Sequence, residues 1–209
     1  MNDYFLLLDT EAINLDKPYI YDIGYIVVDK NLQPATYGHM VLSQVYDNDM
    51  LFNTAYYGNK RPIYTSRLKG KTARKTHVGH AMRTLNSLIK TYGINRVYAY
   101  NIPFDSRAFT FTTKFFKLDN PLDKLEKVDI QAIANQKIHN TKAYKEFAKN
   151  KGYVSEKGYL QMNVEKTFEF LRGEPFQENH LGLDDCFVEL DILKACKELE
   201  PQKRKFIKA

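Results

Sequence analysis

The sequence predicts one α/β domain, 1–209, built around a mixed β-sheet. The predicted elements run strand, strand, strand, helix, strand, helix, and then further helices, an order typical of this class. Residues 4–8 form a short unbroken apolar run, which indicates a strand buried on both faces in the middle of the sheet. A length of 209 residues suits a single domain that buries roughly 70% of the unfolded chain's surface.

Three strands open the chain. Residues 4–11 form the first, and the β-branched and aromatic stretch 19–29 forms the second. Residues 35–42 form the third. Turns at 14–18 and 30–32 separate the three strands, so we expect an antiparallel three-strand meander.

The segment 43–80 has no clean hydrophobic period, and we interpret it as an insertion of one or two short helices and an ordered loop. Interleaved rings and cations can bind a single nucleic acid strand, with cations on phosphates and rings on bases. A solvated basic loop whose tyrosines pack on the core is an equally good interpretation. The aromatic and basic residues concerned are Tyr56, Tyr57, Lys60, Arg61, Tyr64, Arg67, Lys69, Lys71, Arg74, Lys75 and His77.

The middle of the chain continues the α/β pattern. Apolar residues recur at helical spacing over 80–92, and Gly93 ends that helix. Residues 96–100 form a fourth buried strand, which Pro103 terminates. A helix then begins at Asp105 and runs to about Phe116.

The last part of the chain is mostly helical. Residues 127–130 form a short fifth strand, which gives a mixed five-stranded sheet. Helices follow through Ile138 and at 141–151, 164–171 and 183–199, and 200–209 form a basic tail. The last helix has an apolar stripe of Leu183, Cys186, Phe187, Leu190 and Leu193.

Composition limits the partners and the compartment. The net charge of +6 and the pI of about 9.1 are compatible with a polyanionic partner but do not require one. Cys186 and Cys196 lie ten residues apart in one predicted helix, about 15 Å, which is too far for a disulfide. No signal-like N-terminus and no apolar stretch near the ~20 residues of a membrane span is present. We therefore expect a soluble cytoplasmic protein without a membrane partner.

Two acids end the first strand. Asp9 and Glu11 are two residues apart, so their side chains point to the same side. Two carboxylates that emerge together from a buried strand repel each other, and Mg²⁺ or Mn²⁺ is the natural cation for clustered oxygen ligands. Taken alone, the pair also has a structural interpretation, in which Asp9 leaves the strand and Glu11 caps the next turn.

Other acids follow later elements. Asp105 follows the fourth strand, and Asp184 and Asp185 open the last helix shortly after His180. Each also has an ordinary structural interpretation: Asp105 as a helix N-cap, and the pair as acids that favour the positive end of a helix dipole.

Together, these residues fit one site of four carboxylates and a histidine. Such a cluster can hold two divalent ions about 3.5–4 Å apart for in-line attack on phosphorus. His180 would take the proton of the attacking water, a task that suits an imidazole titrating near neutral pH. Five residues separate it from Asp185, so it must lie on the loop before the helix, free to swing over the metals. Asp185 is preferred to Asp184 as a ligand because it lies beside the core stripe, on the same side as Val188, Glu189 and Ile192.

The acidic motifs resemble those of the DEDDh 3′–5′ exonucleases, a family that includes proofreading subunits, ribonuclease T and oligoribonuclease. Residues 8–11 (Leu-Asp-Thr-Glu) are similar to the first motif, and residues 101–105 (Asn-Ile-Pro-Phe-Asp) to the second, Asn-x-x-Phe-Asp. His180, four residues and then Asp185 reproduce the third motif of the histidine subclass, whereas the tyrosine subclass would carry tyrosine in place of Leu181. The resemblance covers nearly the whole chain.

The resemblance implies a ribonuclease H-like fold, two Mg²⁺ or Mn²⁺ ions, and release of nucleoside monophosphates from a 3′ end. It assigns metal binding to Asp9, Glu11, Asp105 and Asp185. His180 becomes the general base, and Glu11 also takes part in catalysis. Residues 55–64 and 178–185 look most like bacteriophage-encoded members, for which the compartment would be the host cytoplasm.

The resemblance also implies a binding place for the terminal nucleotide. Thr10, Ala12 and Ile13 would hold that nucleotide, with Asn101 of the second motif beside it. Phe104 either packs near the nucleotide or is a plain core residue.

We therefore expect a metal-dependent 3′–5′ exonuclease acting on single-stranded DNA rather than RNA. An RNA-trimming enzyme of the same mechanism remains an alternative, because the sequence does not reveal a contact to the 2′-hydroxyl. A non-catalytic nucleic-acid-binding or polymerase-associated subunit on the same fold is the other alternative, and the intact set of acids argues against it.

Overall fold

The computed structural model describes residues 4–199, and the basic tail lies outside the described residues. One mixed sheet has the strand order β4-β3-β2-β1-β5-β6. Neighbouring strands are antiparallel from β1 to β3 and parallel elsewhere, which confirms the mixed sheet and the meander. The strands are β1 (Tyr4–Ala12), β2 (Ile20–Asp29), β3 (Pro34–Leu42), β4 (Arg74–Thr76), β5 (Arg96–Ala99) and β6 (Glu126–Asp129).

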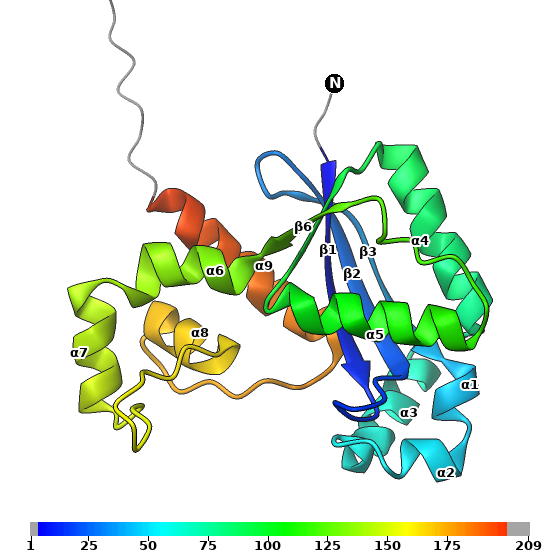
Figure 1. Cartoon of the computed structure of the whole chain (residues 1–209), viewed down its shortest axis with the longest axis horizontal. Coiled ribbons are helices and arrows are strands. Elements are labelled where there is room, and N and C mark those ends of the chain that lie inside the picture. Colours follow the sequence, from blue (N-terminus) through cyan, green and yellow to red (C-terminus); the bar gives the residue numbers. More distant parts are fainter. Residues whose placement is uncertain (1–3, 200–209) are drawn as a thin grey trace, which may run out of the picture.

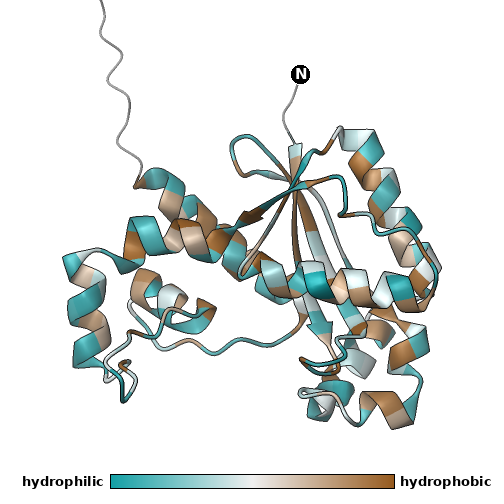
Figure 2. Cartoon of the chain, in the orientation of Figure 1, coloured by the Kyte–Doolittle hydropathy of each residue, from teal (hydrophilic) through white to brown (hydrophobic). Residues whose placement is uncertain are grey.

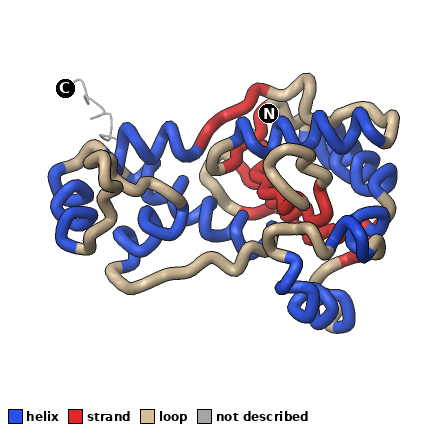
Figure 3. The backbone as a smooth tube through the Cα atoms, turned by 60° about the horizontal axis from the view of Figure 1, so that its bottom comes forward, coloured by secondary structure: helices blue, strands red, loops and turns tan. Residues whose placement is uncertain are grey.

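Helices cover both faces of this sheet (Figure 1). Three short helices follow β3, where the sequence predicted one or two, and a π-helical turn, Asn135–His139, extends α6. Figure 3 shows the strands enclosed between helical layers. The helices are α1 (Ser43–Tyr46), α2 (Asp49–Phe52), a 3₁₀ turn at Gly58–Lys60, α3 (Arg61–Lys69), α4 (Val78–Tyr92), α5 (Ile102–Phe115), α6 (Ile130–Ala134), α7 (Lys142–Asn150), α8 (Val164–Arg172) and α9 (Gly182–Glu198).

The central strand β1 is buried on both faces, as its unbroken apolar run predicts. Leu6 and Leu8 pack with α4 and α5 in one core, and Leu7 packs with α6 and α9 in the other. All three leucines are fully buried. In Figure 2 hydrophobic colour concentrates on the central strands, whereas the helices alternate between hydrophobic and hydrophilic turns.

The prediction of five strands was wrong, because β4 adds a sixth at the edge of the sheet. This strand is only three residues long, Arg74-Lys75-Thr76, and two of them are exposed cations. Hydrogen bonding to β3, rather than a hydrophobic pattern, defines it. A short charged edge strand also protects the sheet against pairing with another chain.

The start of helix α5 and the placement of one side chain differ from the sequence predictions. Helix α5 begins at Ile102 instead of Asp105, and its N-cap is Asn101 in the left-handed conformation with φ of 63°. Pro103 therefore lies in the first helical turn, where its missing N–H costs no hydrogen bond. Phe187 does not belong to the buried stripe of α9, because its side chain is partly exposed and contacts Tyr37 edge-on.

The inserted segment 43–80 packs on the sheet through a third core cluster. Tyr64 of α3 is fully buried there beside Tyr21 of β2 and Phe52 of α2. Tyr56, in contrast, is 82% exposed. Packing on the core is thus confirmed for Tyr64, and binding of a nucleic acid strand by the exposed Tyr56 stays a prediction. None of the described helices has the length and apolar character needed to cross a membrane.

Candidate active site

Strand β1 delivers Asp9 and Glu11 to the face of the sheet that α9 covers. Leu7, two residues before Asp9, packs in the same core as Cys186 and Leu190 of α9. Because side chains alternate along a strand, both carboxylates leave β1 on this side. The register shifts directly after Glu11, so the strand is irregular where the acids end it.

Asp105 lies in the first turn of α5 and is tied to β1. Its Oδ1 accepts hydrogen bonds from the Thr10 backbone N at 3.0 Å and from the Thr10 hydroxyl at 2.7 Å. Only 2% of Asp105 is exposed. These bonds fix the N-terminus of α5 beside Asp9.

Asp185 lies in the first turn of α9, close to β1 and β2. Its Oδ2 accepts a hydrogen bond from the Leu181 backbone N at 2.8 Å. A Cβ added to Gly182 would lie 2.5 Å from the backbone N of Gly24 and 3.0 Å from the backbone O of Asp9. The helix therefore reaches the acids of β1 only because position 182 has no side chain.

Asp184 points elsewhere. Its Oδ2 lies 2.6 Å from an Arg67 guanidinium nitrogen and accepts a hydrogen bond from the Asn179 side chain at 3.1 Å. This placement agrees with the preference for Asp185 at the site.

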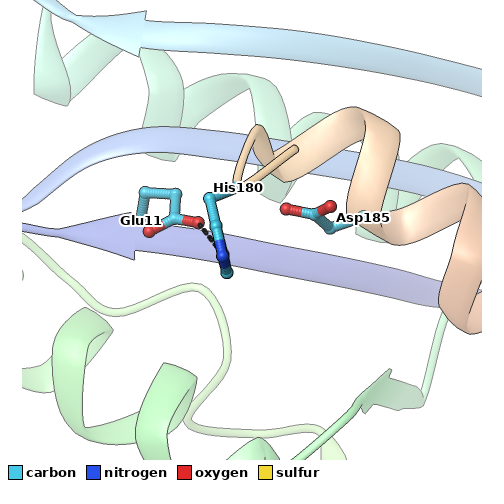
Figure 4. A group of neighbouring side chains, drawn as sticks. All are labelled: Glu11, His180 and Asp185. Carbon is cyan, nitrogen blue, oxygen red and sulfur yellow. Dashed lines mark ion pairs between the residues drawn. The ribbon is translucent and has the colours of Figure 1, made fainter. Parts of the chain in front are cut away.

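His180 lies on the loop before α9, as its spacing predicts, in the left-handed backbone conformation with φ of 50°. Its Nδ1 is 3.8 Å from Oε1 of Glu11. Potential ligand atoms of Glu11, His180 and Asp185 all lie within 4.8 Å of one another. Figure 4 shows the imidazole between the two carboxylates, with Glu11 on the strand and Asp185 on the helix.

Burial and mutual repulsion make the carboxyl groups hard to ionise. Burial, followed by the charges of neighbouring acids, raises the pKa of Asp9 and of Glu11 well above the ordinary range. Burial raises the pKa of Asp105 to about 7, against the lowering effect of its bonds to Thr10. Burial, with Glu178 nearby, raises the pKa of Asp185 to about 8.

His180 shifts in the opposite direction. Burial, reinforced by the positive charge of Lys60, lowers the pKa of its imidazole to about 4. The near-neutral titration expected from the sequence is therefore wrong for this ring, which is neutral near pH 7 and has a lone pair that can accept a proton.

The donor set fits a divalent metal ion. Asp9 Oδ2 and Asp185 Oδ1 are buried without a hydrogen-bond partner, and so is Oε2 of Glu189. Within residues 4–199 no lysine or arginine forms an ion pair with these three acids. Buried carboxylates require compensation, and hard oxygen donors in this number suit Mg²⁺ or Mn²⁺.

Glu189 is a fifth acid to which the sequence analysis assigned no function. It lies one turn after Asp185 on α9 and is 2% exposed. Among the neighbouring charges, that of Glu189 raises the pKa of Asp9 most. The i, i+4 spacing from Asp185 was the available signal, since it places both carboxylates on one side of the helix.

Tyr57 and Lys60 of the inserted segment also reach the site. The ring of Tyr57 stacks on the imidazole of His180, with centroids 3.8 Å apart and planes 13° apart. The Lys60 ammonium donates a hydrogen bond to the backbone O of Asn179 at 2.5 Å. No periodicity or motif in the sequence indicates these contacts, because they join segments about 120 residues apart.

A cavity of about 620 Å³ opens beside Glu11. It includes three of the five residues expected to bind a nucleotide, namely Ala12, Ile13 and Phe104. Thr10 and Asn101 do not line it, since the Thr10 hydroxyl bonds to Asp105 and Asn101 is exposed at the start of α5. The other lining residues are Asn14, Leu15, Asp16, Thr54, Tyr56 and Tyr57.

The chain is similar in structure to several solved exonucleases. Exonuclease I from Methylocaldum szegediense superposes with a TM-score of 0.65 at 14% identity over 96% of this chain and 41% of that one. E. coli Exonuclease I in complex with a dT13 oligonucleotide gives 0.63 at 12% identity, over 96% and 41%. The nuclease domain of 3′hExo, a DEDDh family member bound to rAMP, gives 0.59 at 14% identity, over 94% and 92%.

This chain thus spans about two fifths of the Exonuclease I chains and nearly all of the 3′hExo nuclease domain. No protein-family model and no curated protein sequence matches it. The likeness therefore concerns the fold, in which the sheet and its helices bring the acids of β1, α5 and α9 together. The chain has the ribonuclease H-like α/β fold of the DEDDh 3′–5′ exonucleases.

Proposed function

We propose that this chain is a divalent-metal-dependent 3′–5′ exonuclease that releases nucleoside monophosphates from single-stranded DNA. One observation supports this proposal most strongly: buried carboxylate oxygens without partners lie beside a neutral imidazole that faces Glu11 and Asp185. Such a set combines a metal site with a proton acceptor, which is what hydrolysis of a phosphodiester requires.

The residues of the site have different roles according to their positions. Asp9, Glu11, Asp105 and Asp185 would hold the metal ions, and Thr10 orients Asp105 through two hydrogen bonds. Bound Mg²⁺ or Mn²⁺ would supply Lewis acidity and lower the pKa of water. His180 accepts the proton of the attacking water at a ring nitrogen, and its Nδ1 lies 3.8 Å from Oε1 of Glu11.

The cavity beside Glu11 is the place for the terminal nucleotide. Ala12, Ile13 and Phe104 offer apolar surface to a base or sugar, and exposed Tyr56 offers a ring on which a base can stack. Its volume of about 620 Å³ lies in the range of small-molecule sites.

An RNA exonuclease of the same mechanism is the second candidate. The 3′hExo domain, which this chain matches over 92% of that domain's length, is bound to rAMP. Discrimination between the two sugars depends on contacts to the 2′-hydroxyl, and the cavity contains Asn14, Asp16 and Thr54 as polar groups that could make them.

Degradation of matched 5′-labelled DNA and RNA oligonucleotides, with Mg²⁺, Mn²⁺ or EDTA, tests the function. We expect a ladder that shortens from the 3′ end with metal, that forms faster on DNA, and that His180→Ala slows to a residual rate. The exposed α4 residue His80 gives a matched control, His80→Ala, which keeps full activity. Faster degradation of RNA would select the second candidate, and tight binding without metal-dependent cleavage would select a non-catalytic subunit.

A further inference from the structure

We infer that Tyr57 is a positioning residue for His180, and that the inserted segment 43–80 serves to hold the imidazole in its working orientation. The inference rests on the proposed function, because it concerns the same histidine. Its physical basis is a set of contacts that fix first the backbone and then the ring of residue 180.

The backbone of the His180 loop is contacted at four successive residues, at three of them by a hydrogen bond. The Asn179 O accepts a hydrogen bond from Lys60 Nζ at 2.5 Å, and the His180 O lies 3.3 Å from the Tyr64 hydroxyl oxygen. The Leu181 N donates to Asp185 at 2.8 Å, and the N of residue 182 donates to an Asp22 carboxylate at 3.0 Å. The sequence prediction of a freely swinging loop therefore does not match this backbone.

Tyr64 and Asp22 are themselves fixed. Both are fully buried, and the Tyr64 hydroxyl donates to Asp22 Oδ2 at 2.8 Å. The other oxygen of Asp22 lies 2.7 Å from Nε2 of His39. Asp22 and Tyr64 thus connect the loop to the buried core between β2, β3 and α3, whereas Lys60 reaches it from the 3₁₀ turn.

Because the backbone of residue 180 is fixed, the imidazole can move only by rotation about the side-chain bonds of His180. Tyr57 restricts this rotation. The two rings are nearly parallel, at 13° and 3.8 Å, so rotation of the imidazole would break the stack. In this orientation a ring nitrogen of His180 still faces Glu11 and Asp185. The stack therefore holds a histidine that points into the site, rather than one turned away from it.

Tyr57 is in turn held by its neighbours in the insertion. Tyr56 contacts it edge-on, with ring centroids 4.8 Å apart, and the Lys60 ammonium lies 5.2 Å from its ring centroid. One face of the Tyr57 ring is occupied by His180, although the residue also lines the nucleotide cavity. If Tyr57 acts by positioning His180, its loss should lower kcat. If Tyr57 binds the substrate directly, its loss should raise KM.

Steady-state kinetics of Tyr57→Leu and Tyr57→Phe on the labelled oligonucleotide separate these roles. We expect Tyr57→Leu to lower kcat roughly 10- to 100-fold with KM within about 3-fold, since a misplacement of about 1 Å costs roughly that much. Tyr57→Phe keeps the ring and restores most of kcat. The matched control Tyr159→Leu, at a tyrosine 71% exposed on another loop, changes neither constant. A rise in KM with unchanged kcat would overturn the inference.

Combining Tyr57→Leu with His180→Ala gives a sharper comparison. If Tyr57 acts only through His180, the double variant is no slower than His180→Ala alone. A double-variant rate reduced by the product of the two single-variant factors would show that Tyr57 acts independently and would overturn the inference.

A readout that needs no nuclease activity distinguishes failure of the inference from failure of the proposed function. The Hε1 proton of His180 belongs to the imidazole that stacks on Tyr57, so the Tyr57 ring should shield it. Its resonance is assigned by its loss in His180→Ala. It should move downfield in Tyr57→Leu and stay in place in Tyr57→Phe. An unmoved resonance in Tyr57→Leu would refute the stack whatever the activity. If the resonance moves in Tyr57→Leu but the wild-type protein has no nuclease activity, only the proposed nuclease function is refuted.

Discussion

At the scale of single residues, neighbours in the sequence have sharply different environments. Asp185 is 3% exposed and faces other acids, whereas Asp184 pairs with Arg67, and both of these side chains are partly buried. Glu189, four residues later, is as deeply buried as Asp185 and also has an oxygen without a partner. Helical geometry explains the difference, because residues four apart share a side of the helix and adjacent residues do not.

Asp185→Asn should abolish catalysis while stabilising the metal-free fold. Loss of a metal ligand should lower kcat at least about 100-fold, beyond the 10–100-fold typical of an outer-shell partner. Removal of one buried acid from a repelling cluster should raise the free energy of unfolding in EDTA. Oligonucleotide kinetics and urea titrations measure the two effects. The matched substitution Asp184→Asn should leave kcat nearly unchanged, and equal losses in both variants would contradict the assignment.

Gly182→Ala should destabilise the fold. The new Cβ would meet the backbone of β2 and β1, which cannot move aside without displacing α9 and Asp185. A cost of about 1–3 kcal/mol is typical of such overpacking, and activity should fall with it. Gly79→Ala in α4 is the control, because its Cβ would be in ordinary contact at 3.6 Å or more. Urea unfolding that showed equal stability for both variants would contradict the close approach.

At the scale of elements, the sequence predicted what hydrophobic pattern determines. The unbroken run of β1 and the apolar spacing of α4 identified both elements because burial imposes those patterns. Strand β4 and the contacts of Tyr57 escaped prediction, since a three-residue charged strand and a ring stack between distant segments leave no periodic signal. The motif resemblance brought Asp105 into the candidate site, although its local pattern equally suggested an N-cap.

Tyr64→Phe should weaken the junction between α3 and the loop before α9. The variant removes a hydrogen bond to the buried Asp22 carboxylate, and bonds to charged groups contribute about 1.5–3 kcal/mol. We expect the free energy of unfolding to fall by about that amount in urea titrations. Tyr46→Phe, which loses a neutral bond to Thr65 at 3.2 Å, is the control and should cost less. A larger decrease in the free energy of unfolding for Tyr46→Phe than for Tyr64→Phe would show that the junction does not depend on Asp22.

At the scale of the whole molecule, a basic chain encloses an acidic centre. The net charge is +6, yet the acids of β1, α5 and α9 gather where burial raises their pKa values. The overall charge favours approach of a polyanion, whereas the centre disfavours its phosphates until cations neutralise it. Stability, metal binding and pH should therefore be linked in this protein.

Without metal, stability should fall as the pH rises. An aspartate in the unfolded chain titrates near pH 3.9, whereas burial raises the pKa of Asp105 to about 7 and that of Asp185 to about 8. Between these values these two groups hold more protons in the folded state than in the unfolded state, so their contribution to the free energy of unfolding decreases from about pH 4 and levels off above about pH 8. Urea titrations in EDTA across this range measure the slope.

Divalent metal should reverse that trend. A cation binds the ionised carboxylates of the folded state alone, so the stabilisation by Mn²⁺ should be larger at pH 8 than at pH 5. In Asp185→Asn one titrating ligand is missing, and we expect both a shallower pH slope in EDTA and a smaller gain from Mn²⁺. Equal stability at pH 5 and pH 8 in EDTA would show that the acids are not held together without metal. An equal Mn²⁺ gain at both pH values would place the bound cation away from them.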